Sequence, residues 1–355
     1  MNAPRALWDF TLDELTAALG SRTRALRALS WVYSQAPLGP DVPQSMPEVS
    51  HRTWTPFSQT VSCRLPQVTE RHEAEDGTTK YALRVGEATV ETVRIPAKGR
   101  STVCVSSQAG CTRKCAFCAT QTLGFTRHLS AAEIVAQYLV ARAEAPTHAP
   151  ARNVVFMGMG EPMDNLDAVL RAVELLTQAP APQLGAAQVT VSTSGVLPGI
   201  QRFLKESKAS LALSLNATTD ETRAAIMPHT KTWPIADLLG ALRDDRAVHP
   251  TREHFMEYVM LDGVNDTDAD ADRLAVLLDG LAARVNLIPH NPFPGNSLRP
   301  PPHERVMAFQ KRVASRGVLC LVRWPRGRDI AAACGQWVLA KSAQGFSPPL
   351  SERST

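Results

Sequence analysis

Three cysteines within one short stretch constrain this chain more than any other feature. Cys111, Cys115 and Cys118 stand at the spacing C-x3-C-x2-C. Zinc sites usually offer four ligands in two pairs, so this triplet fits zinc poorly. Three thiolates suit a [4Fe–4S] cluster that keeps one iron open for a further ligand, because a short loop can place each sulfur at a different corner of the cube. The spacing therefore predicts an iron–sulfur site, with three unrelated buried thiols as the alternative.

The rest of the composition describes an ordinary globular chain. At 355 residues, with 44% hydrophobic and 20% charged residues, it can bury a full core and suggests one large domain plus an accessory piece. No apolar run approaches the roughly 18 residues of a membrane span, and the N-terminal sequence MNAPRALWDFTLDEL lacks the profile of a signal peptide. We therefore expect a cytoplasmic protein with no membrane partner and, by default, a monomer.

Cysteine usage and charge narrow the chemistry. The chain has seven cysteines, an odd number with three of them clustered, which favours cofactor and thiol chemistry over a disulfide framework. The net charge of +4 and the pI near 8.7 are mildly basic. They permit an RNA partner without requiring one.

The first 60 or so residues predict a small helical module. Thr11 and Glu14 form a capping box that opens a helix ending near Leu19, and a second helix is expected over 23–33. Residues 36–58 are rich in Pro and Ser and predict a loop. Three arginines of this module can contact RNA phosphates or form an ordinary solvated helix face: Arg22, Arg24 and Arg27.

A β-hairpin is expected next. Two strand-like runs, Tyr81–Val85 and Ala88–Val93, are joined at Gly86-Glu87, and the second run carries Glu91. Residues 96–100 then predict a short linker.

From Ser101 onward, strand-like and helical segments alternate, which indicates a parallel α/β sheet. About six such units are too few for a closed eight-stranded barrel, so the fold class is α/β with an open partial (β/α)6 barrel. The expected strands are 102–106, 153–158, 188–192, 211–215, 255–261, 285–289 and 318–323. The expected helices are 130–145, 166–177, 198–207, 220–226, 269–278 and 303–316.

These patterns divide the chain into four parts. An N-terminal accessory domain is expected over 1–75, a β-hairpin and linker over 76–100, the α/β domain that carries the candidate site over 101–341, and a loose tail over 342–355.

Polar residues follow several of the expected strands, where a barrel of this kind places its active residues. Gly160 and Glu161 follow the second core strand, and two glycines in this segment would let a ligand approach the backbone closely while Glu161 accepts from an ammonium or a ribose hydroxyl. Taken singly, each polar residue is more often a turn residue or a cap. Their shared position favours a nucleoside site, with the further candidates Ser192, Ser214, Asn216 and Asn291.

Two cysteines outside the triplet also stand in distinctive places. Cys104 lies on the first core strand, and Cys334 lies in a loop of small residues after the last strand. Such a loop allows a thiol to enter an active site without clashing. The alternative for each is a small buried hydrophobe, which is also our interpretation of Cys63 and Cys320.

Taken together, these motifs resemble one known family. The segments CVSSQAGC, CAFC, GMGEP, STSG, LALSLNA, IMPHTK, EYVMLDGVND, VNLIPHNPFPG and RGRDIAAACGQ occur in this order. They resemble the RlmN/Cfr family of radical-SAM RNA adenosine methyltransferases, over roughly residues 80–340. The resemblance implies a radical-SAM core, a [4Fe–4S] cluster, two molecules of S-adenosylmethionine (SAM) per turnover, and an N-terminal RNA-binding domain.

The resemblance also assigns roles residue by residue. Cys111, Cys115 and Cys118 would hold the cluster, and the SAM site would be lined by Gly160, Glu161, Ser192, Ser214, Leu215, Asn216 and Asn291. Cys334 is similar to the cysteine that becomes S-methylated, Cys104 to its transient disulfide partner, and Glu91 to the proton acceptor.

The chemistry of the family follows from these roles. C2 of adenine is a poor nucleophile, whereas the Cys334 thiolate can take a methyl group from a first SAM. A second SAM, cleaved reductively, yields a 5′-deoxyadenosyl radical that removes hydrogen from this methyl group, and the carbon radical adds to adenine. Glu91 would remove the C2 proton, and Cys104 would release the methylated RNA by attacking the sulfur of Cys334. An external electron donor is required.

The expected substrates are 23S rRNA and tRNA, at the adenosine 3′ of the anticodon. Unstacked RNA bases are bound through backbone charge and stacking, and the arginines near Cys334 can hold phosphates or face solvent: Arg323, Arg326 and Arg328. Three alternatives remain at this point: C8 methylation of rRNA by the other branch of the family, a non-catalytic RNA-binding relative, and a radical-SAM enzyme acting on a small molecule.

The chain departs from the family pattern at three places. Asn216 stands where many relatives have His, His290 replaces a more common aromatic residue, and the segment 324–328 differs from the usual sequence. These departures leave a further alternative open, a divergent paralogue with another RNA target, because the cysteines expected to carry the chemistry are retained.

Overall fold

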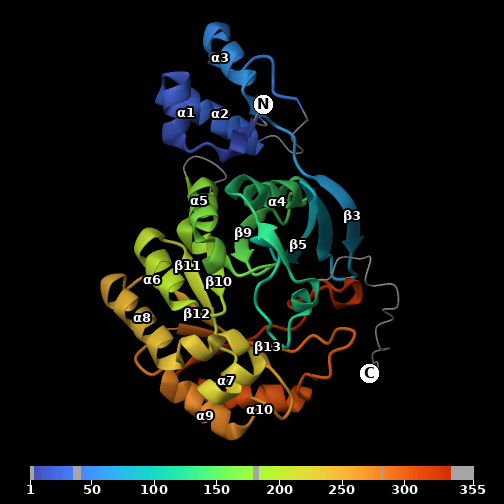
Figure 1. The fold of residues 1–355 in the computed structure, drawn as a ribbon, viewed down its shortest axis with the longest axis vertical. Helices are drawn as coiled ribbons and strands as arrows, with labels where there is room; N and C mark the ends of the chain where they lie inside the picture. Colours follow the sequence, from blue (N-terminus) through green and yellow to red (C-terminus); the bar gives the residue numbers. More distant parts are fainter. Residues whose placement is uncertain (1–3, 35–40, 179–183, 282, 337–355) are drawn as a thin grey trace.

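The computed structural model of this protein describes residues 4–34, 41–178, 184–281 and 283–336. The predicted tail over 342–355 lies outside these residues. The centre of the fold is a ten-stranded sheet in the order β14-β13-β12-β11-β10-β9-β6-β5-β4-β3 (Figure 1). None of the described helices is long and apolar enough to cross a membrane.

Seven strands of this sheet are parallel and form the partial barrel. The edge strands β3 and β14 do not pair with each other in the described residues, so the barrel is open as predicted. Its parallel strands are β6 (Arg100–Cys104), β9 (Ala151–Phe156), β10 (Val189–Thr193), β11 (Ser210–Ser214), β12 (His254–Met260), β13 (Ala283–Pro289) and β14 (Leu319–Val322).

Helices connect these strands on the outside of the barrel (Figure 1). A capping box of Ser130 and Glu133 opens α4, at the start of the helix predicted over 130–145. One helix, α8, was not predicted from the sequence. The helices are α4 (Ala131–Ala143), α5 (Leu166–Thr177), α6 (Leu197–Glu206), α7 (Asp220–Ile226), α8 (Ile235–Val248), α9 (Asp268–Leu277) and α10 (His303–Ala314). Short 3-10 turns lie at 7–9, 119–123, 162–165, 186–188, 228–232 and 328–330.

An antiparallel extension continues the sheet beyond β6. The predicted hairpin is formed by β4 (Thr79–Val85) and β5 (Ala88–Ala97), and β3 (Gln67–Glu73) adds a strand that was not predicted. The expected linker over 96–100 is wrong, because β5 runs through Ala97 and β6 begins at Arg100, with only a tight turn between them. A second, two-stranded sheet pairs β7 (Gln108–Gly110) with β8 (Phe125–His128) around the cysteine loop.

The N-terminal module, meaning the described residues between 4 and 62, contains α1 (Leu12–Leu19), α2 (Arg22–Ser34) and α3 (His51–Ser58). The short strands β1 (Arg5–Ala6) and β2 (Val61–Ser62) pair with each other. The capping box at Thr11 and Glu14 is confirmed. The predicted loop over 36–58 is wrong at its end, because Ser50 caps α3 and Trp54 anchors it in the core.

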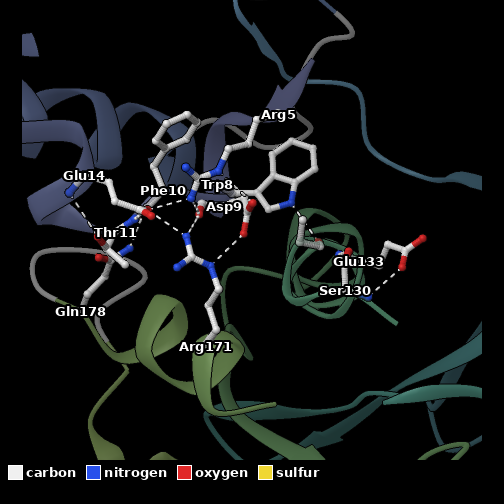
Figure 2. Close-up of polar contacts among 11 residues, drawn as sticks. Arg5, Trp8, Asp9, Phe10, Thr11, Glu14, Ser130, Glu133, Arg171 and Gln178 are labelled. Atoms are coloured by element: carbon white, nitrogen blue, oxygen red, sulfur yellow. Dashed lines mark hydrogen bonds and ion pairs between the residues drawn. The ribbon is translucent and has the colours of Figure 1, made fainter. Parts of the chain in front are cut away.

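The N-terminal module is fixed to the barrel by polar contacts (Figure 2). Arg171 rises from α5 and donates to the Asp9 carbonyl at 2.6 Å and to Glu14 Oε2 at 2.8 Å. The indole of the buried Trp8 donates to the Ala132 carbonyl of α4 at 3.0 Å. Gln178 adds two bonds, accepting from Leu12 N and donating to the Phe10 carbonyl.

Candidate active site

The cysteine loop, residues 111–118, is anchored by main-chain bonds to distant elements. Cys111 N donates to the Gly124 carbonyl at 2.8 Å, and Ala116 N donates to the carbonyl of Ile226 at 2.9 Å. Phe117 packs against a small apolar cluster that includes Ala217 and Met227. These contacts place the loop across the C-terminal ends of the barrel strands, at the edge where the candidate residues were predicted.

The three cysteines of this loop are free thiols. Burial raises the pKa of Cys111 to about 12, and the nearby Cys118 adds to that increase. Burial, then the charges of Cys118 and Cys111, also raise the pKa of Cys115. Among the described residues, no three His, Cys, Asp or Glu side chains converge as they would on a single metal ion. A cube binds each cysteine through a different iron, so the three ligands of a cluster need not converge on one point.

A cavity joins the cysteine loop to the Cys334 segment, which we define as residues 326–336. Cys334 is exposed to this cavity, yet the protein around it raises the pKa of its thiol to about 12. The cavity is lined by Phe117, Cys118, Thr120, Met157, Gly158, Val259, Ile288, His290, Asn291, Cys334 and Gly335. The structure therefore brings together Cys118, Asn291 and Cys334, which the sequence placed in three separate motifs.

Cys104 lies close to Cys334. Its thiol is buried, forms no disulfide and hydrogen-bonds the backbone of Met157, which lines the same cavity. Burial, followed by the charge of Cys334, raises its pKa. The pair thus occupies one neighbourhood although 229 residues of sequence separate the two cysteines. Lys80 connects Glu91 to the Cys334 segment. Its ammonium lies 3.5 Å from Glu91 Oε1 and donates to the Ala331 carbonyl at 3.2 Å.

The Gly160–Glu161 segment differs from the simplest sequence interpretation. The Glu161 carboxylate accepts from Met163 N at 3.0 Å and from Ser194 N and Oγ at 2.7 and 2.6 Å, so protein donors engage both of its oxygens. A Cβ at Gly160 would lie 2.7 Å from the Gln108 side chain, so packing against Gln108 is by itself a reason for glycine at this position. In this structure the segment ties the end of β9 to the end of β10.

Ser192 and Ser214 lie side by side on β10 and β11, with their hydroxyls 3.5 Å apart. Asn216 adopts a left-handed backbone with φ of 58°, which Asn tolerates better than most residues. Its side chain accepts from Val259 N at 2.8 Å and contacts the Met227 sulfur. This scaffold role gives a physical reason for Asn at that position.

Arg223 is a buried residue of the site that the sequence analysis missed. Its guanidinium donates to the carbonyls of Leu215 at 3.0 Å and Ser194 at 2.6 Å, so it connects the ends of β10 and β11. Burial lowers its pKa to about 10, and its Nη1 has no partner among the described residues. An arginine within a helix carries no motif, so only the fold reveals this role.

The residues present fit the cofactors that the sequence predicts. Three free thiols face one region, and two buried polar atoms nearby lack partners in the described residues, namely Arg223 Nη1 and Asn291 Oδ1. An unbonded buried donor and acceptor are costly unless a ligand uses them. This donor set suits an iron–sulfur cluster and a zwitterionic nucleoside such as SAM.

Comparison with known proteins identifies the family. The radical SAM superfamily model matches residues 105–275. The dual-specificity RNA methyltransferase RlmN of Alkalilimnicola ehrlichii is 43% identical, over 92% of this chain and 91% of that protein. The RlmN of Syntrophobacter fumaroxidans is 40% identical over 94% and 98%. The chain belongs to the RlmN family of radical-SAM methyltransferases.

A solved structure supports the same conclusion. The radical SAM methyltransferase from Sphaerobacter thermophilus is 39% identical, with a TM-score of 0.84 over 94% of this chain and 99% of that one. The predicted radical-SAM fold is therefore confirmed. As an RlmN-family enzyme, this protein uses an iron–sulfur cluster and SAM.

The arginines expected to contact RNA have protein partners in several cases. In the N-terminal module, Arg27 pairs with Glu48 at 2.7 Å and Arg24 donates to the Leu19 carbonyl at 3.1 Å. Near Cys334, Arg323 donates to Asn286 Oδ1 at 2.9 Å and Arg326 lies 3.5 Å from Asp76. These four arginines therefore have partners within the protein, and their contact with RNA stays a prediction.

Proposed function

We propose that this protein methylates C2 of an adenosine in 23S rRNA and in tRNA, at the adenosine 3′ of the anticodon, through an S-methylcysteine on Cys334. The observation that carries the proposal is the meeting of Cys104 and Cys334 beside the cavity that Cys118 also lines. Simple binding of RNA needs neither thiol, and a cluster needs only the triplet. One thiol in the lining of the cavity and a second, buried thiol beside it suit covalent transfer followed by thiol exchange.

We assign the [4Fe–4S] cluster to Cys111, Cys115 and Cys118. SAM would lie against Gly160, Glu161, Ser192, Ser214, Leu215, Asn216 and Asn291. When bound, these groups would supply a methyl group from one SAM and, with a second SAM, the one-electron chemistry that activates the methyl carbon. An external donor supplies the electrons.

The residues of the chain have distinct tasks in this scheme. Cys334 Sγ accepts the methyl group. Cys334 is exposed and lines the cavity, which would give its thiol access to both cofactor and substrate. Burial raises the pKa of Glu91 to about 7, which suits a base that removes the C2 proton near neutral pH. Cys104 Sγ then bonds to Cys334 Sγ and displaces the methylated base, which leaves a disulfide that must be reduced.

The N-terminal module would hold the RNA. Its fixed attachment through Arg171 and Trp8 gives bound RNA a defined orientation relative to the barrel. We retain the division into an accessory domain over 1–75, a hairpin over 76–100 and a catalytic domain over 101–341, acting as a monomer in the cytoplasm.

The decisive test is methylation by the reconstituted enzyme. The full chain is reconstituted without oxygen using iron and sulfide, then incubated with SAM, a reductant and protein-free rRNA or tRNA, and the nucleosides are analysed by mass spectrometry. We expect 2-methyladenosine, abolished separately by Cys118→Ala and by Cys334→Ala. Cys104→Ala should instead leave RNA covalently attached to the protein. Cys320→Ala, a buried cysteine with no assigned task, is the matched control and should retain activity.

Other products would overturn the proposal. An 8-methyladenosine product would place the protein in the C8-methylating branch. SAM cleavage without methylated adenosine on either RNA would mean that the substrate is a different molecule.

A further inference from the structure

The strand register brings three reactive side chains onto one face of the antiparallel extension. Ala82 lies opposite Glu91, and Val93 lies opposite both Lys80 of β4 and Cys104 of β6. Directly opposed residues project to the same side of a sheet, and alternate residues of a strand share a face. Lys80, Glu91 and Cys104 therefore point to the same side.

The Cys334 segment covers this face. The Lys80 ammonium donates to the Ala331 carbonyl at 3.2 Å, and the charge of Cys334 contributes to the raised pKa of Cys104. Ala331 has a left-handed backbone with φ of 51°, which a non-glycine residue keeps only where its surroundings hold it. Lys80 is thus one of the contacts that fix the chain three residues before Cys334.

Lys80 also determines how Glu91 is presented. Its ammonium lies 3.5 Å from Glu91 Oε1, and the two side chains are 9% and 2% exposed. The other oxygen, Oε2, is buried and has no hydrogen-bond partner among the described residues. A buried ion pair is poor evidence of stability, and an unpartnered oxygen adds a further cost. Stability therefore does not explain why this pair is present.

We propose that Lys80 is a positioning residue for the reaction: its ammonium pairs with Glu91 Oε1 and ties this side chain to the Cys334 segment, so that Oε2 is left free to take the C2 proton of the adenine held on Cys334. This inference rests on the proposed function. Neither the cysteine motifs nor the strand-end residues pointed to Lys80.

The electrostatics of the site support this role. Burial raises the pKa of Glu91 to about 7, the charge and hydrogen bond of Lys80 oppose that increase, and Glu70 of β3 adds to it. Cys104 of β6 and Cys334 face the same region as thiols of raised pKa. Arg94 of β5 lies on the other face of the sheet from Glu91, where it donates to Thr79 Oγ1. Lys80 is the charged group that opposes protonation of Glu91, so its removal should leave this carboxyl neutral at pH 7.

The test compares Lys80→Met with Lys80→Arg and with Lys205→Met, an exposed lysine of α6. Each reconstituted full-length enzyme is assayed for 2-methyladenosine formation from about pH 6 to about pH 9.5. Peptide mass spectrometry measures S-methylation of Cys334 in the same samples, and denaturing gels measure RNA attached covalently to the protein.

A specific pattern is expected from these variants. Activity should rise with pH in each enzyme. Loss of one adjacent charge should shift this rise in Lys80→Met to a pH that is higher by about 1–2 units, so the rate at pH 7 falls about 5- to 50-fold. Activity should return at high pH, RNA–protein adduct should accumulate at pH 7, and Cys334 should still become methylated. Lys80→Arg should retain most of the activity and Lys205→Met all of it. A uniform loss at every pH, or loss of Cys334 methylation together with turnover, would overturn the inference.

A measurement without RNA separates this inference from the proposed function. Carbon-13 NMR of protein labelled at the glutamate carboxyls, with Glu91 assigned through Glu91→Gln, follows the titration of Glu91 directly. The Glu91 signal should titrate at higher pH in Lys80→Met than in the wild type. An unchanged titration would overturn the role of Lys80 even if the enzyme methylates RNA. A shifted titration without any methyladenosine would instead place the failure in the proposed function.

Discussion

The barrel is contacted by two peripheral segments in different ways. The N-terminal module is attached by the buried indole of Trp8, which donates to a carbonyl of α4, and by Arg171 of α5, which bridges Asp9 and Glu14 (Figure 2). The Cys334 segment is held near its thiol through three carbonyl groups, which accept from Lys80, Asn291 and Ala119 N, and at its start by Gly327 N, which donates to Asp76. One attachment fixes a body, whereas the other positions a short stretch of backbone.

This difference matches the role that we propose for each region. A module that orients RNA, as we propose, needs a rigid and stable interface. In the proposed reaction Cys334 approaches a methyl donor, then a base, then Cys104, and a short segment held by a few hydrogen bonds permits small shifts without unfolding. Substitutions in the module should therefore change the free energy of unfolding, whereas substitutions around the Cys334 segment should change the approach of the two thiols.

The largest expected effect is on stability, from Trp8→Ala. Removing a 3%-exposed indole that also donates to Ala132 should lower the free energy of unfolding by about 3–5 kcal/mol. Urea denaturation measures this change, and Trp324→Ala, at 45% exposure, is the matched control with little expected effect. The rate of Cys104–Cys334 disulfide formation with a mild oxidant should stay near that of the wild type. A slower disulfide without lost stability would contradict the comparison.

The next effect concerns the Cys334 segment and comes from Gly327→Ala. A Cβ there would lie 2.8 Å from Thr78 and 2.9 Å from Ala332, at a φ of +60° that costs an L-residue about 1–2 kcal/mol. The segment should shift, and Cys104–Cys334 disulfide formation should slow about tenfold, the effect of about 1.4 kcal/mol. Gly20→Ala shares the positive φ but meets no neighbour within 4 Å, so it should leave the disulfide rate unchanged. Equal rates for both variants would break the distinction between the two regions.

The smallest effect is the pH dependence of the module interface. Burial alone would raise the pKa of Glu14, but bonds from Thr11, Arg171 and Arg5 together lower it from 4.5 to about 2. A carboxyl whose pKa is lower in the folded state stabilises the fold above its unfolded pKa and loses that contribution as pH falls. Since this side chain is 38% exposed, we expect only about 1 kcal/mol, lost between about pH 5 and pH 2.

Glu14→Gln provides the check on this pH effect. Denaturation of this variant should show a flatter dependence of stability on pH over the same range. The rate of Cys104–Cys334 disulfide formation should match that of the wild type at neutral pH. A variant as steep as the wild type would mean that another group carries the acid sensitivity.

Local sequence signals were sufficient for much of this protein. The capping boxes at Thr11 and Ser130, the alternation of strands and helices, and the spacing of Cys111, Cys115 and Cys118 depend on residues close together in the chain. The missed elements lacked such a signal. Strand β3 is largely exposed and α3 contains Pro56, so neither shows a clear periodic apolar pattern.

The site itself divides along the same line. The sequence alone determined the candidate residues for the chemistry, because thiols and strand-end polar groups can be recognised from motif and position. Only the tertiary structure decided that protein donors engage Glu161, that Arg223 connects two strand ends, and that Lys80 joins Glu91 to the Cys334 segment. Those facts depend on strand register and on contacts between residues as far apart as Lys80 and Ala331, and no local pattern encodes either.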